Sequence, residues 1–291
     1  MSPSKPVILV TGASGQLGRL VVEELLKTVP QSQLVATARN VDALADLEAR
    51  GVEVRQADFS KPDTMDAAFK GVDKLLLISS SEIGQRGPQH LNAINAAKAA
   101  GVSLIAYTSV LHADTSTLDL AIEHRETEQA LAEAGVPYVL LRNGWYTENH
   151  TASIPPALAH GAFIGCANEG KISSASRGDF AAAASAVLTA ADDQAGRTYE
   201  LAGDATYTLE EFTAEVAKQS GKPVVYQDLS QDEYKVALVG AGIPNGAAHI
   251  YAQSDAAASR GALFDDGRQL SKLIGRATTP YATTIGEALA G

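Results

Sequence analysis

The sequence contains a single cysteine, Cys166, among its 291 residues. One thiol cannot form an intramolecular disulfide, and it excludes metal and iron–sulfur sites that need several cysteines. No histidine motif that could activate this thiol is visible. We therefore expect Cys166 to be a small buried apolar residue rather than a nucleophile.

Long apolar runs and basic clusters are also missing. No run approaches the length of a membrane span, and the first residues, M-S-P-S-K-P, lack the apolar stretch of a secretory signal. The chain has 23 basic and 34 acidic side chains, with a formal net charge of -11 and no basic face. We therefore expect no membrane and no nucleic-acid partner, and the cytoplasm is the expected compartment.

Two motifs of nucleotide and metal chemistry are absent as well. No Gly-Lys-Ser/Thr sequence follows a glycine turn, which argues against a nucleoside triphosphatase. The six histidines form no H-x-x-x-H pattern, so no metal site is expected. The sequence is 45% hydrophobic, which is ample for a folded core.

The most informative segment that is present runs over residues 7–20 and reads V-I-L-V-T-G-A-S-G-Q-L-G-R-L. An apolar run followed by Gly12, Gly15 and Gly18 and then by helical periodicity predicts a strand, a tight turn and a helix start. Such a turn presents backbone N–H groups and the positive end of a helix dipole to an anion. The spacing G-x-x-G-x-x-G departs from the standard G-x-G-x-x-G, so the motif alone leaves a purely structural turn open.

Each glycine has an expected task in a dinucleotide site. Gly12 would allow the turn, Gly15 would let the backbone approach a pyrophosphate, and Gly18 would let the helix pack closely on the strand.

Strands and helices alternate through the first half of the chain. Further strands are predicted at 34–38, 52–57, 74–78, 103–108 and 137–141, and helices at 41–50, 64–69, 90–100 and 120–134. Gly51, Gly71, Gly101 and Gly135 each stand where a helical pattern stops. We therefore predict an α/β fold for residues 1–150, a Rossmann-like, doubly wound parallel sheet that binds NADP.

The remainder, residues 151–291, predicts a smaller mixed α/β lobe on the substrate side. Short strands are expected at 162–164, 198–201 and 224–226, and helices at 179–191, 209–220, 231–240 and 247–258. No linker or repeat separates this part from the first. We expect it to pack on the first domain and not to be independent.

The residue after the second predicted strand favours one cofactor. NAD-binding proteins place Asp or Glu there on the ribose hydroxyls, whereas Arg accommodates the 2′-phosphate of NADP. This chain has Arg39, which favours NADPH, with a solvated surface arginine as the alternative. Asp58, after the third strand, could reach the adenine edge or could simply form a turn.

Several segments carry a resemblance to a known family. They are T-G-A-S-G-Q-L-G at the glycine turn, A-R-N after strand two, L-L-L-I-S-S-S-E-I-G-Q-R at 75–86, I-A-Y-T-S at 105–109, L-L-R-N-G-W-Y-T-E-N at 140–149, F-I-G-C-A at 163–167 and L-F-D-D at 263–266. The chain resembles the atypical short-chain dehydrogenase/reductases of the NmrA-like group nearly from end to end. Within that group it is most similar to the bacterial NAD(P)H:quinone oxidoreductases of the second type.

The resemblance implies a set of cofactor-binding residues. Those on the pyrophosphate would be Gly12, Ala13, Ser14, Gly15, Gln16 and Leu17, with Arg39 on the 2′-phosphate and Ser79, Ser80 and Ser81 beside the ribose and adenine. Those beside the nicotinamide and the acceptor would be Asn143, Gly144, Trp145, Tyr146, Thr147, Glu148 and Asn149. A further wall of the substrate site would comprise Arg86, Gly87, Pro88, Gln89, His90 and Leu91.

The Tyr-x-x-x-Lys pair of the wider superfamily is missing. If Glu128 marks the glutamate that follows this pair, His124 stands at the lysine position and Leu120 at the tyrosine position. Oxidation of an alcohol needs a base, so this departure argues against alcohol dehydrogenation. A quinone is already electrophilic and needs mainly positioning and a hydrogen-bond donor for the developing phenolate.

Four residues are candidates for this acceptor chemistry. Asn143 and Tyr146 could donate hydrogen bonds near the acceptor oxygen, and Trp145 could form a wall. For Trp145 and Tyr146, packing between the two lobes is the alternative. His124 could shuttle a proton by titrating near neutral pH, or it could be an ordinary residue on a helix face.

The resemblance implies NADPH-dependent reduction of quinones to hydroquinones in a cleft between the lobes, without flavin or metal. The expected partner is a small-molecule quinone, and the protein would be a monomer or a homodimer. Two alternatives stay open: reduction of another conjugated acceptor, as in triphenylmethane dye reductases, and a non-catalytic NADPH-binding sensor, as in NmrA.

Overall fold

The computed structural model describes residues 6–291, and its main feature is a seven-stranded sheet with the order β3-β2-β1-β4-β5-β6-β8. The strands are β1 (Ile8–Val10), β2 (Leu34–Ala38), β3 (Glu53–Gln56), β4 (Lys74–Leu77), β5 (Leu104–Val110), β6 (Tyr138–Asn143) and β8 (Thr198–Leu201). β1 pairs in parallel with β2 and β4, β2 with β3, and β4 with β5. This is the strand order of the doubly wound dinucleotide fold, and it confirms the predicted fold class.

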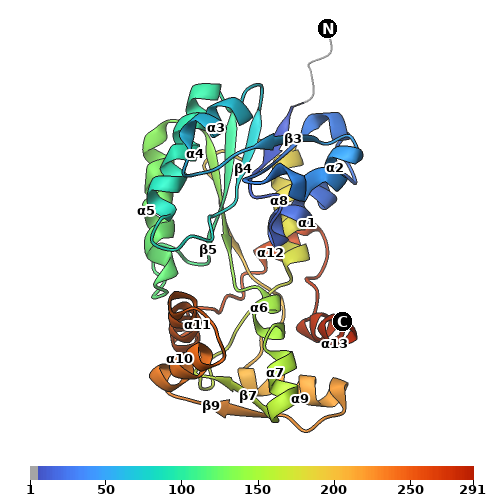
Figure 1. The fold of residues 1–291 in the computed structure, drawn as a ribbon, viewed down its shortest axis with the longest axis vertical. Coiled ribbons are helices and arrows are strands. Elements are labelled where there is room, and N and C mark those ends of the chain that lie inside the picture. Colours follow the sequence, from blue (N-terminus) through green and yellow to red (C-terminus); the bar gives the residue numbers. More distant parts are fainter. Residues whose placement is uncertain (1–5) are drawn as a thin grey trace. The chain divides into compact units, whose positions relative to one another are not determined.

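Helices connect these strands and lie on both sides of the sheet. They are α1 (Gln16–Leu25), α2 (Ala45–Ala49), α3 (Pro62–Ala68), α4 (Arg86–Ala100), α5 (Leu120–Ala134) and α8 (Arg177–Thr189), with short 3-10 turns at Gln31–Gln33 and Val41–Leu44. Figure 1 shows α4 and α5 on one side of the sheet and α1 and α8 on the other. The four glycines predicted at helix ends all have positive φ, as Gly101 does at the end of α4.

One core cluster lies between the sheet and the helices α3 and α4. Alternate residues of β4 and β5 point to the same face of a sheet, and here Leu75, Leu77, Ile105 and Tyr107 are fully buried in this cluster. Burial of each large aliphatic side chain stabilises the fold by about 1.5–3 kcal/mol.

Helix α4 presents small residues to this core. Ala93 and Ala97, one turn apart, are fully buried, and the same helix face carries His90 one turn earlier. The packing of α4 on the core therefore directs His90 inward near the start of the helix.

The rest of the chain contains a second, two-stranded parallel sheet. It is formed by β7 (Ala162–Gly165) and β9 (Val225–Asp228). The accompanying helices are α6 (Thr147–Thr151), α7 (Ile154–His160), α9 (Leu209–Ser220), α10 (Gln231–Gly240), α11 (Asn245–Ala258), α12 (Gln269–Ile274) and α13 (Tyr281–Ala290). Cys166 is buried in a cluster with Tyr234, Ala252 and Ala256, which confirms that it is a small core residue. Burial raises the pKa of its thiol to about 12.

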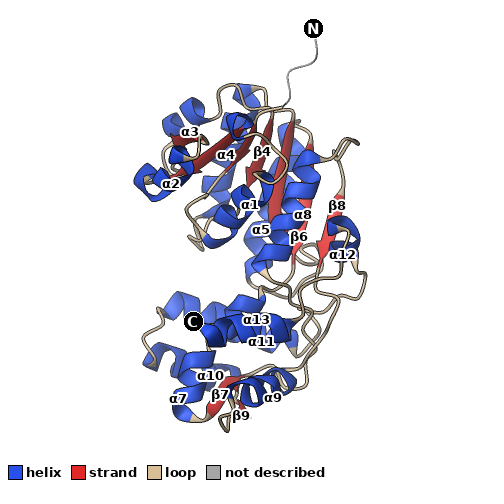
Figure 2. Ribbon diagram, turned by 90° about the vertical axis from the view of Figure 1, so that its right-hand side faces the viewer, coloured by secondary structure: helices blue, strands red, loops and turns tan. Residues whose placement is uncertain are grey.

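The strand predicted at 198–201 belongs to the main sheet and not to the smaller lobe, so that part of the prediction is wrong. Figure 2 shows β8 beside β6. The reason is tertiary pairing, because a run of four residues, T-Y-E-L, carries no indication of which sheet it joins. Helices α6, α7, α12 and α13 were not predicted, since two are only 5 and 6 residues long and α7 opens with two prolines.

The chain divides into two compact units. We call the first the sheet unit, which comprises the chain up to Val110, Glu123–Arg142 and Phe180–Tyr199, and the remainder, Leu111–Ile122, Asn143–Asp179 and Glu200–Gly291, the second unit. This division is discontinuous, whereas the sequence predicts one boundary at residue 150. The physical reason is that α8 returns to the sheet, where the Lys74 ammonium donates a hydrogen bond to the carbonyl of Leu188 at 2.7 Å.

Among residues 6–291, no helix is both long and apolar enough to cross a membrane.

Candidate functional site

The glycine turn links β1 to α1 in the sheet unit. Gly12 has a φ of +58°, a conformation that side chains disfavour. Gly15 precedes the first residue of α1 and is exposed, as are Ser14 and Gln16. In the described part of the chain, α1 has no side-chain cap and no acidic residue in its first turn. Its first N–H groups therefore form a positively polarised surface that can accept an anion.

Gly18 lets α1 approach the turn. A Cβ atom at this position would lie 2.3 Å from the carbonyl oxygen of Gly12 and 2.9 Å from Cα of Ala13. Both atoms belong to the backbone and cannot rotate away. The close approach expected for Gly18 is therefore present in the structure.

Neighbouring strands hold the turn in place. The N–H of Ala13 donates to the carbonyl of Thr37 in β2 at 2.8 Å. The Thr11 hydroxyl donates to the carbonyl of Leu76 in β4 at 3.0 Å and accepts from the N–H of Ile78 at 2.9 Å. The turn is thus tied to the strands on both sides of β1.

Arg39 follows β2, beside the glycine turn. Its guanidinium Nη1 forms an ion pair with Oε1 of Glu82 at 2.6 Å. The Arg39 side chain is 68% exposed and that of Glu82 is 42% exposed. A cation at this position can bind a phosphate group.

The loop after β4, which contains Ser79, Ser80 and Ser81, is hydrogen-bonded to side chains near the start of α4. The N–H of Ser80 donates to Nε2 of His90 at 2.9 Å, and Nε of Arg86 donates to the carbonyl of Ser80 at 2.7 Å. Arg86 and His90, expected to form a substrate wall, therefore position the loop expected beside the ribose.

The hydrogen bonds of His90 define its protonation. Nε2 accepts a hydrogen bond, so Nδ1 carries the proton and donates to the hydroxyl of Thr127 at 2.8 Å. Thr127 in turn donates to the carbonyl of Glu123. Burial and the nearby Arg86 charge lower the pKa of His90 to about 3, so the ring is neutral at physiological pH.

His124 lies in α5 and pairs with Tyr107 of β5. Nδ1 of His124 is 2.7 Å from the Tyr107 hydroxyl oxygen, and both side chains are buried. Burial lowers the pKa of His124 well below 6.5 and raises the pKa of Tyr107. Titration of His124 near neutral pH, which the sequence analysis allowed, is therefore wrong, because burial disfavours the imidazolium.

Asp58 stabilises its own turn. Its Oδ1 accepts from the N–H of Ser60 at 3.0 Å, and Oδ2 lies 3.7 Å from Nζ of Lys61. This arrangement corresponds to the turn-forming alternative. A contact with adenine stays a prediction.

The segment 143–149 lies in the second unit and is organised by Arg177. The backbone N–H of Arg177 donates to Oε1 of Glu148 at 2.8 Å, and its guanidinium Nη2 donates to Oδ1 of Asn149 at 2.8 Å. The Arg177 guanidinium carbon lies 4.6 Å from the centre of the Tyr146 ring. Thr147 is fully buried and shares a hydrogen bond with Ser174.

Among the described residues, two uncharged polar atoms in this segment are buried without a hydrogen-bond partner: Oδ1 of Asn143 and Nε1 of Trp145. A charged one, Oε2 of Glu148, also has no hydrogen bond but lies 3.5 Å from Nη1 of Arg177. Asn143 is 5% exposed and Trp145 is 8% exposed. An unpaired buried polar atom costs about 1–3 kcal/mol unless a ligand or water satisfies it. The pair offers one acceptor and one N–H donor.

Gly144 lies between these two residues, and its Cα is packed closely against the backbone of Leu201. A Cβ atom there would lie 3.0 Å from the carbonyl oxygen of Leu201, and the Gly144 N–H donates to that same carbonyl at 2.7 Å.

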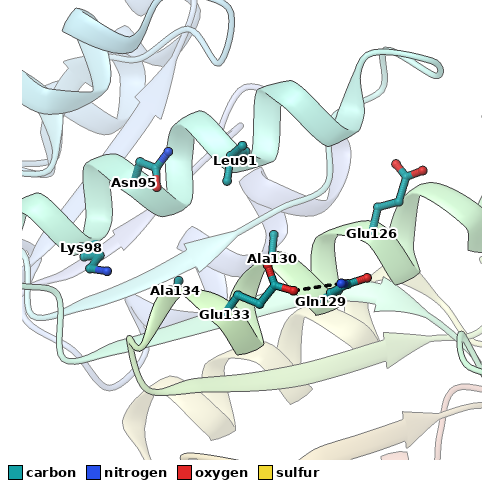
Figure 3. A pocket seen from close by; sticks show the side chains of 8 residues that line it. All are labelled: Leu91, Asn95, Lys98, Glu126, Gln129, Ala130, Glu133 and Ala134. Atoms are coloured by element: carbon teal, nitrogen blue, oxygen red, sulfur yellow. Dashed lines mark hydrogen bonds between the residues drawn. The ribbon is translucent and has the colours of Figure 1, made fainter.

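An outer groove of about 390 Å³ lies between α4 and α5 of the sheet unit. Figure 3 shows Leu91 and Ala130 in it, with Lys98, Glu126 and Glu133 around them. Leu91, which was expected to bind substrate, is 46% exposed and lines this groove, whereas Gln89 and His90 of the same helix are buried. Leu91 therefore points away from Gln89 and His90, which are two of the five residues expected to form the substrate wall with it.

Sequence reasoning missed several residues that organise these sites. Glu82 lies inside a quoted motif, but it was given no role. Arg177 belongs to no motif that could have identified it. A buried ion pair also escaped notice: Arg142 Nη2 lies 2.7 Å from Oε2 of Glu128, and the Ser109 hydroxyl donates to Oε1 of Glu128 at 2.5 Å.

Within residues 6–291, no group of three or more His, Cys, Asp or Glu side chains is arranged to hold a metal ion.

Comparison with known proteins shows the family of this chain and several of its relatives. Residues 12–191 match a family model described as NAD(P)H-binding. The chain is 57% identical to quinone oxidoreductase 2 of Escherichia coli (strain K12) over 279 residues, which cover 96% of this chain and 97% of that protein.

Solved structures agree with this relationship. The E. coli NADPH-dependent quinone oxidoreductase QOR2 in complex with NADPH has a TM-score of 0.93 and 57% identity, covering 96% of this chain and 99% of the other. The triphenylmethane reductase of Citrobacter sp. in complex with NADP(H) has a TM-score of 0.92 and 39% identity, covering 97% and 99%. These similarities confirm the resemblance drawn from the sequence.

The role of Gly18 can be tested with Gly18→Ala. We expect this variant to lose about 1–3 kcal/mol of unfolding free energy, because the new methyl group displaces the Gly12 backbone. Gly246→Ala is the matched control, since a Cβ atom at residue 246 of α11 has no neighbour within 4 Å among the described residues. Equal denaturant midpoints for the two variants would contradict the close approach.

Buried neutral histidines should make the protein sensitive to mild acid. Burial lowers the pKa of His90 to about 3, that of His150 to about 4 and that of His124 well below 6.5. Between pH 6.5 and 5 the unfolded state binds more protons at each, so the free energy of unfolding falls by up to about 1.4 kcal/mol per pH unit per histidine. Asp255, whose pKa burial raises to about 7, binds a proton in the folded state and offsets one of the three.

Denaturant titrations between pH 5 and 6.5 would measure this slope. His90→Gln should reduce the slope by about one proton, because the variant removes one histidine that protonates on unfolding. A wild-type stability that does not fall with acid over this range would contradict the prediction.

Proposed function

Because the chain belongs to the NAD(P)H-binding family, we propose that it is an NADPH-dependent quinone reductase. The single observation that carries this proposal is 57% identity to quinone oxidoreductase 2 over nearly the whole of both chains. The glycine turn, Arg39 and the segment 143–149 all lie within residues 12–191, which match the NAD(P)H-binding family model. The reaction is the reduction of a quinone to a hydroquinone.

The sheet unit provides groups that suit the phosphates of NADPH. The unpaired N–H groups at the start of α1 suit the pyrophosphate, and Gly12 lets the backbone take the required turn. The Arg39 guanidinium suits the 2′-phosphate, which NADH lacks. His90 and Arg86 hydrogen-bond to the backbone of Ser80 and thereby fix the position of the loop after β4.

The second unit provides groups that suit a carboxamide and a carbonyl acceptor. Oδ1 of Asn143 can accept a hydrogen bond, and Nε1–H of Trp145 can donate one. Tyr146 is a further donor, and Arg177 restricts its ring from one face. We infer that Asn143 orients the carboxamide, and that the donors of Trp145 and Tyr146 orient the acceptor and stabilise negative charge on its oxygen.

Bound NADPH would supply the hydride, so the chain itself needs no redox group. His124 and Tyr107 are both neutral at physiological pH, which leaves this pair without a charged base. A quinone ring delocalises the charge that develops during reduction, and hydrogen-bond donors can stabilise that charge without prior proton removal. We propose His124 as a hydrogen-bonding residue and not as a titrating acid.

The proposed compartment is the cytoplasm, which the single cysteine supports. The proposed partner is a small quinone, and the assembly is a monomer or a homodimer.

Mixing purified protein with NADPH and a small benzoquinone tests the proposed reaction. We expect loss of absorbance at the nicotinamide band above the uncatalysed rate. A triphenylmethane dye should be assayed in parallel, because the Citrobacter reductase is 39% identical. Tight NADPH binding without oxidation by either acceptor would contradict an enzymatic role and favour a sensor.

Arg39→Asp tests whether Arg39 recognises the 2′-phosphate of NADPH. A charge-assisted hydrogen bond contributes about 1.5–3 kcal/mol, so NADPH affinity should fall about tenfold or more while NADH affinity changes little. Dissociation constants for both dinucleotides would measure this. Arg50→Asp, at another exposed arginine of the sheet unit, is the control for the change of charge. Equal losses for NADPH and NADH in Arg39→Asp would show that Arg39 does not recognise the phosphate.

Trp145→Phe separates packing from hydrogen bonding. Phenylalanine keeps an aromatic ring and removes the N–H donor, so we expect kcat/KM for the quinone to fall about threefold to tenfold. Stability should be unchanged or higher, because the variant removes a buried donor that has no partner among the described residues. If kcat/KM is unchanged, Trp145 serves only as a packed side chain.

A further inference from the structure

We propose that Glu82 sets the balance between NADPH and NADH by competing with the 2′-phosphate for Arg39. The proposal rests on the proposed cofactor site, in which Arg39 recognises that phosphate. Glu82 would lower the preference for NADPH below the value that Arg39 alone would give. It would act as a specificity-determining residue that touches no reacting atom.

The ion pair joins the two loops that flank the glycine turn. Arg39 follows β2 and Glu82 follows β4, and these strands are the two neighbours of β1 in the sheet. Nη1 of Arg39 lies 2.6 Å from Oε1 of Glu82. A phosphate group that reaches Arg39 must therefore come close to this carboxylate.

Glu82 is held on its other side by a buried residue. Its Oε2 accepts from Nε2 of Gln89 at 2.7 Å, and its backbone N–H donates to the Ser80 hydroxyl at 3.1 Å. Gln89 is only 6% exposed, and its Nε2 also donates to the hydroxyl of Ser60 at 3.1 Å. The position of the Glu82 carboxylate is therefore set by α4 and not by Arg39 alone.

The two cofactors differ in how they would meet this carboxylate. A phosphate monoester carries a charge of about −1.5 to −2 at pH 7, so Glu82 repels it and shares its cation. The 2′-hydroxyl of NADH is neutral and can donate a hydrogen bond to a carboxylate, which is the role of the acidic residue in NAD-specific sites. Glu82 thus opposes NADPH and offers NADH a partner, although the chain lacks an acidic residue directly after β2.

Glu82→Gln removes the charge and keeps the size of the side chain. Binding of NADPH and of NADH to the whole protein would be measured by titration calorimetry. We expect the preference for NADPH to rise about threefold to tenfold, with tighter NADPH binding and weaker or unchanged NADH binding. The gain for NADPH should shrink as salt is added, because both groups are partly exposed.

The matched control is Glu23→Gln. Glu23 forms an exposed ion pair with Arg50 in the same unit, so its replacement changes the net charge equally without altering the proposed site. If Glu82→Gln weakens NADPH binding more than NADH binding, Glu82 positions Arg39 and the proposal is overturned. A preference that changes no more than in Glu23→Gln overturns it as well.

Arg39→Gln, measured in parallel, separates this proposal from the one on which it rests. If Arg39→Gln leaves the preference for NADPH unchanged, the cofactor assignment of Arg39 fails. If that variant abolishes the preference while Glu82→Gln has no effect, only the role of Glu82 fails. Both measurements are of binding, so neither depends on the acceptor that the enzyme reduces.

Discussion

The contact on which the proposed cofactor site depends is the backbone approach of α1 to the glycine turn. With a side chain at residue 18, a carbon atom would lie 2.3 Å from the Gly12 carbonyl oxygen, and the helix would have to move away. The first N–H groups of α1 would move with it. Because Ala13 and Thr11 are tied to β2 and β4, the turn itself has little freedom to compensate. The site for an anion is therefore a consequence of packing and not only of having glycines.

Charge then determines which dinucleotide such a turn prefers. A helix N-terminus attracts any pyrophosphate, so it cannot distinguish NADPH from NADH. We propose that the distinction comes from the loops after β2 and β4, where Arg39 and Glu82 form an ion pair. In the proposed site Arg39 would attract the 2′-phosphate and Glu82 would repel it. The preference for NADPH would then be the difference between this attraction and this repulsion, and each can be changed by one substitution.

The sequence predicted the sheet well because its strands and helix ends depend on local patterns. Apolar runs marked most strands within two residues, and Gly101 and its equivalents marked the ends of helices. The position of Arg39 directly after β2 could be predicted for the same reason, since it follows from the spacing of the strands. The partners of Arg39, His90 and His124 could not be predicted in this way. Glu82, Ser80 and Tyr107 lie 43, 10 and 17 residues away from them in the chain, and only the folded sheet brings each pair together.

The candidate site in the second unit was the hardest part to predict from the sequence. The segment 143–149 was expected to line the acceptor, but no pattern in it indicates that Arg177 organises Tyr146, Glu148 and Asn149. The sequence also could not predict that Oδ1 of Asn143 and Nε1 of Trp145 are buried without a hydrogen-bond partner. Hydrophobic periodicity does not report the burial of a single polar atom.

The neutral state of His124 and Tyr107 bears on which reactions this pair can support. In the extended relatives a tyrosine and a lysine would occupy the positions of Leu120 and His124. Here His124 is buried against Tyr107, and burial keeps both groups neutral. Removing a proton from an alcohol with such a pair would require a charge that this buried site disfavours. Reduction of an acceptor that delocalises its own charge avoids this cost, because the protein then has to supply only position and hydrogen bonds. The burial of this pair therefore disfavours alcohol oxidation by it and is compatible with quinone reduction.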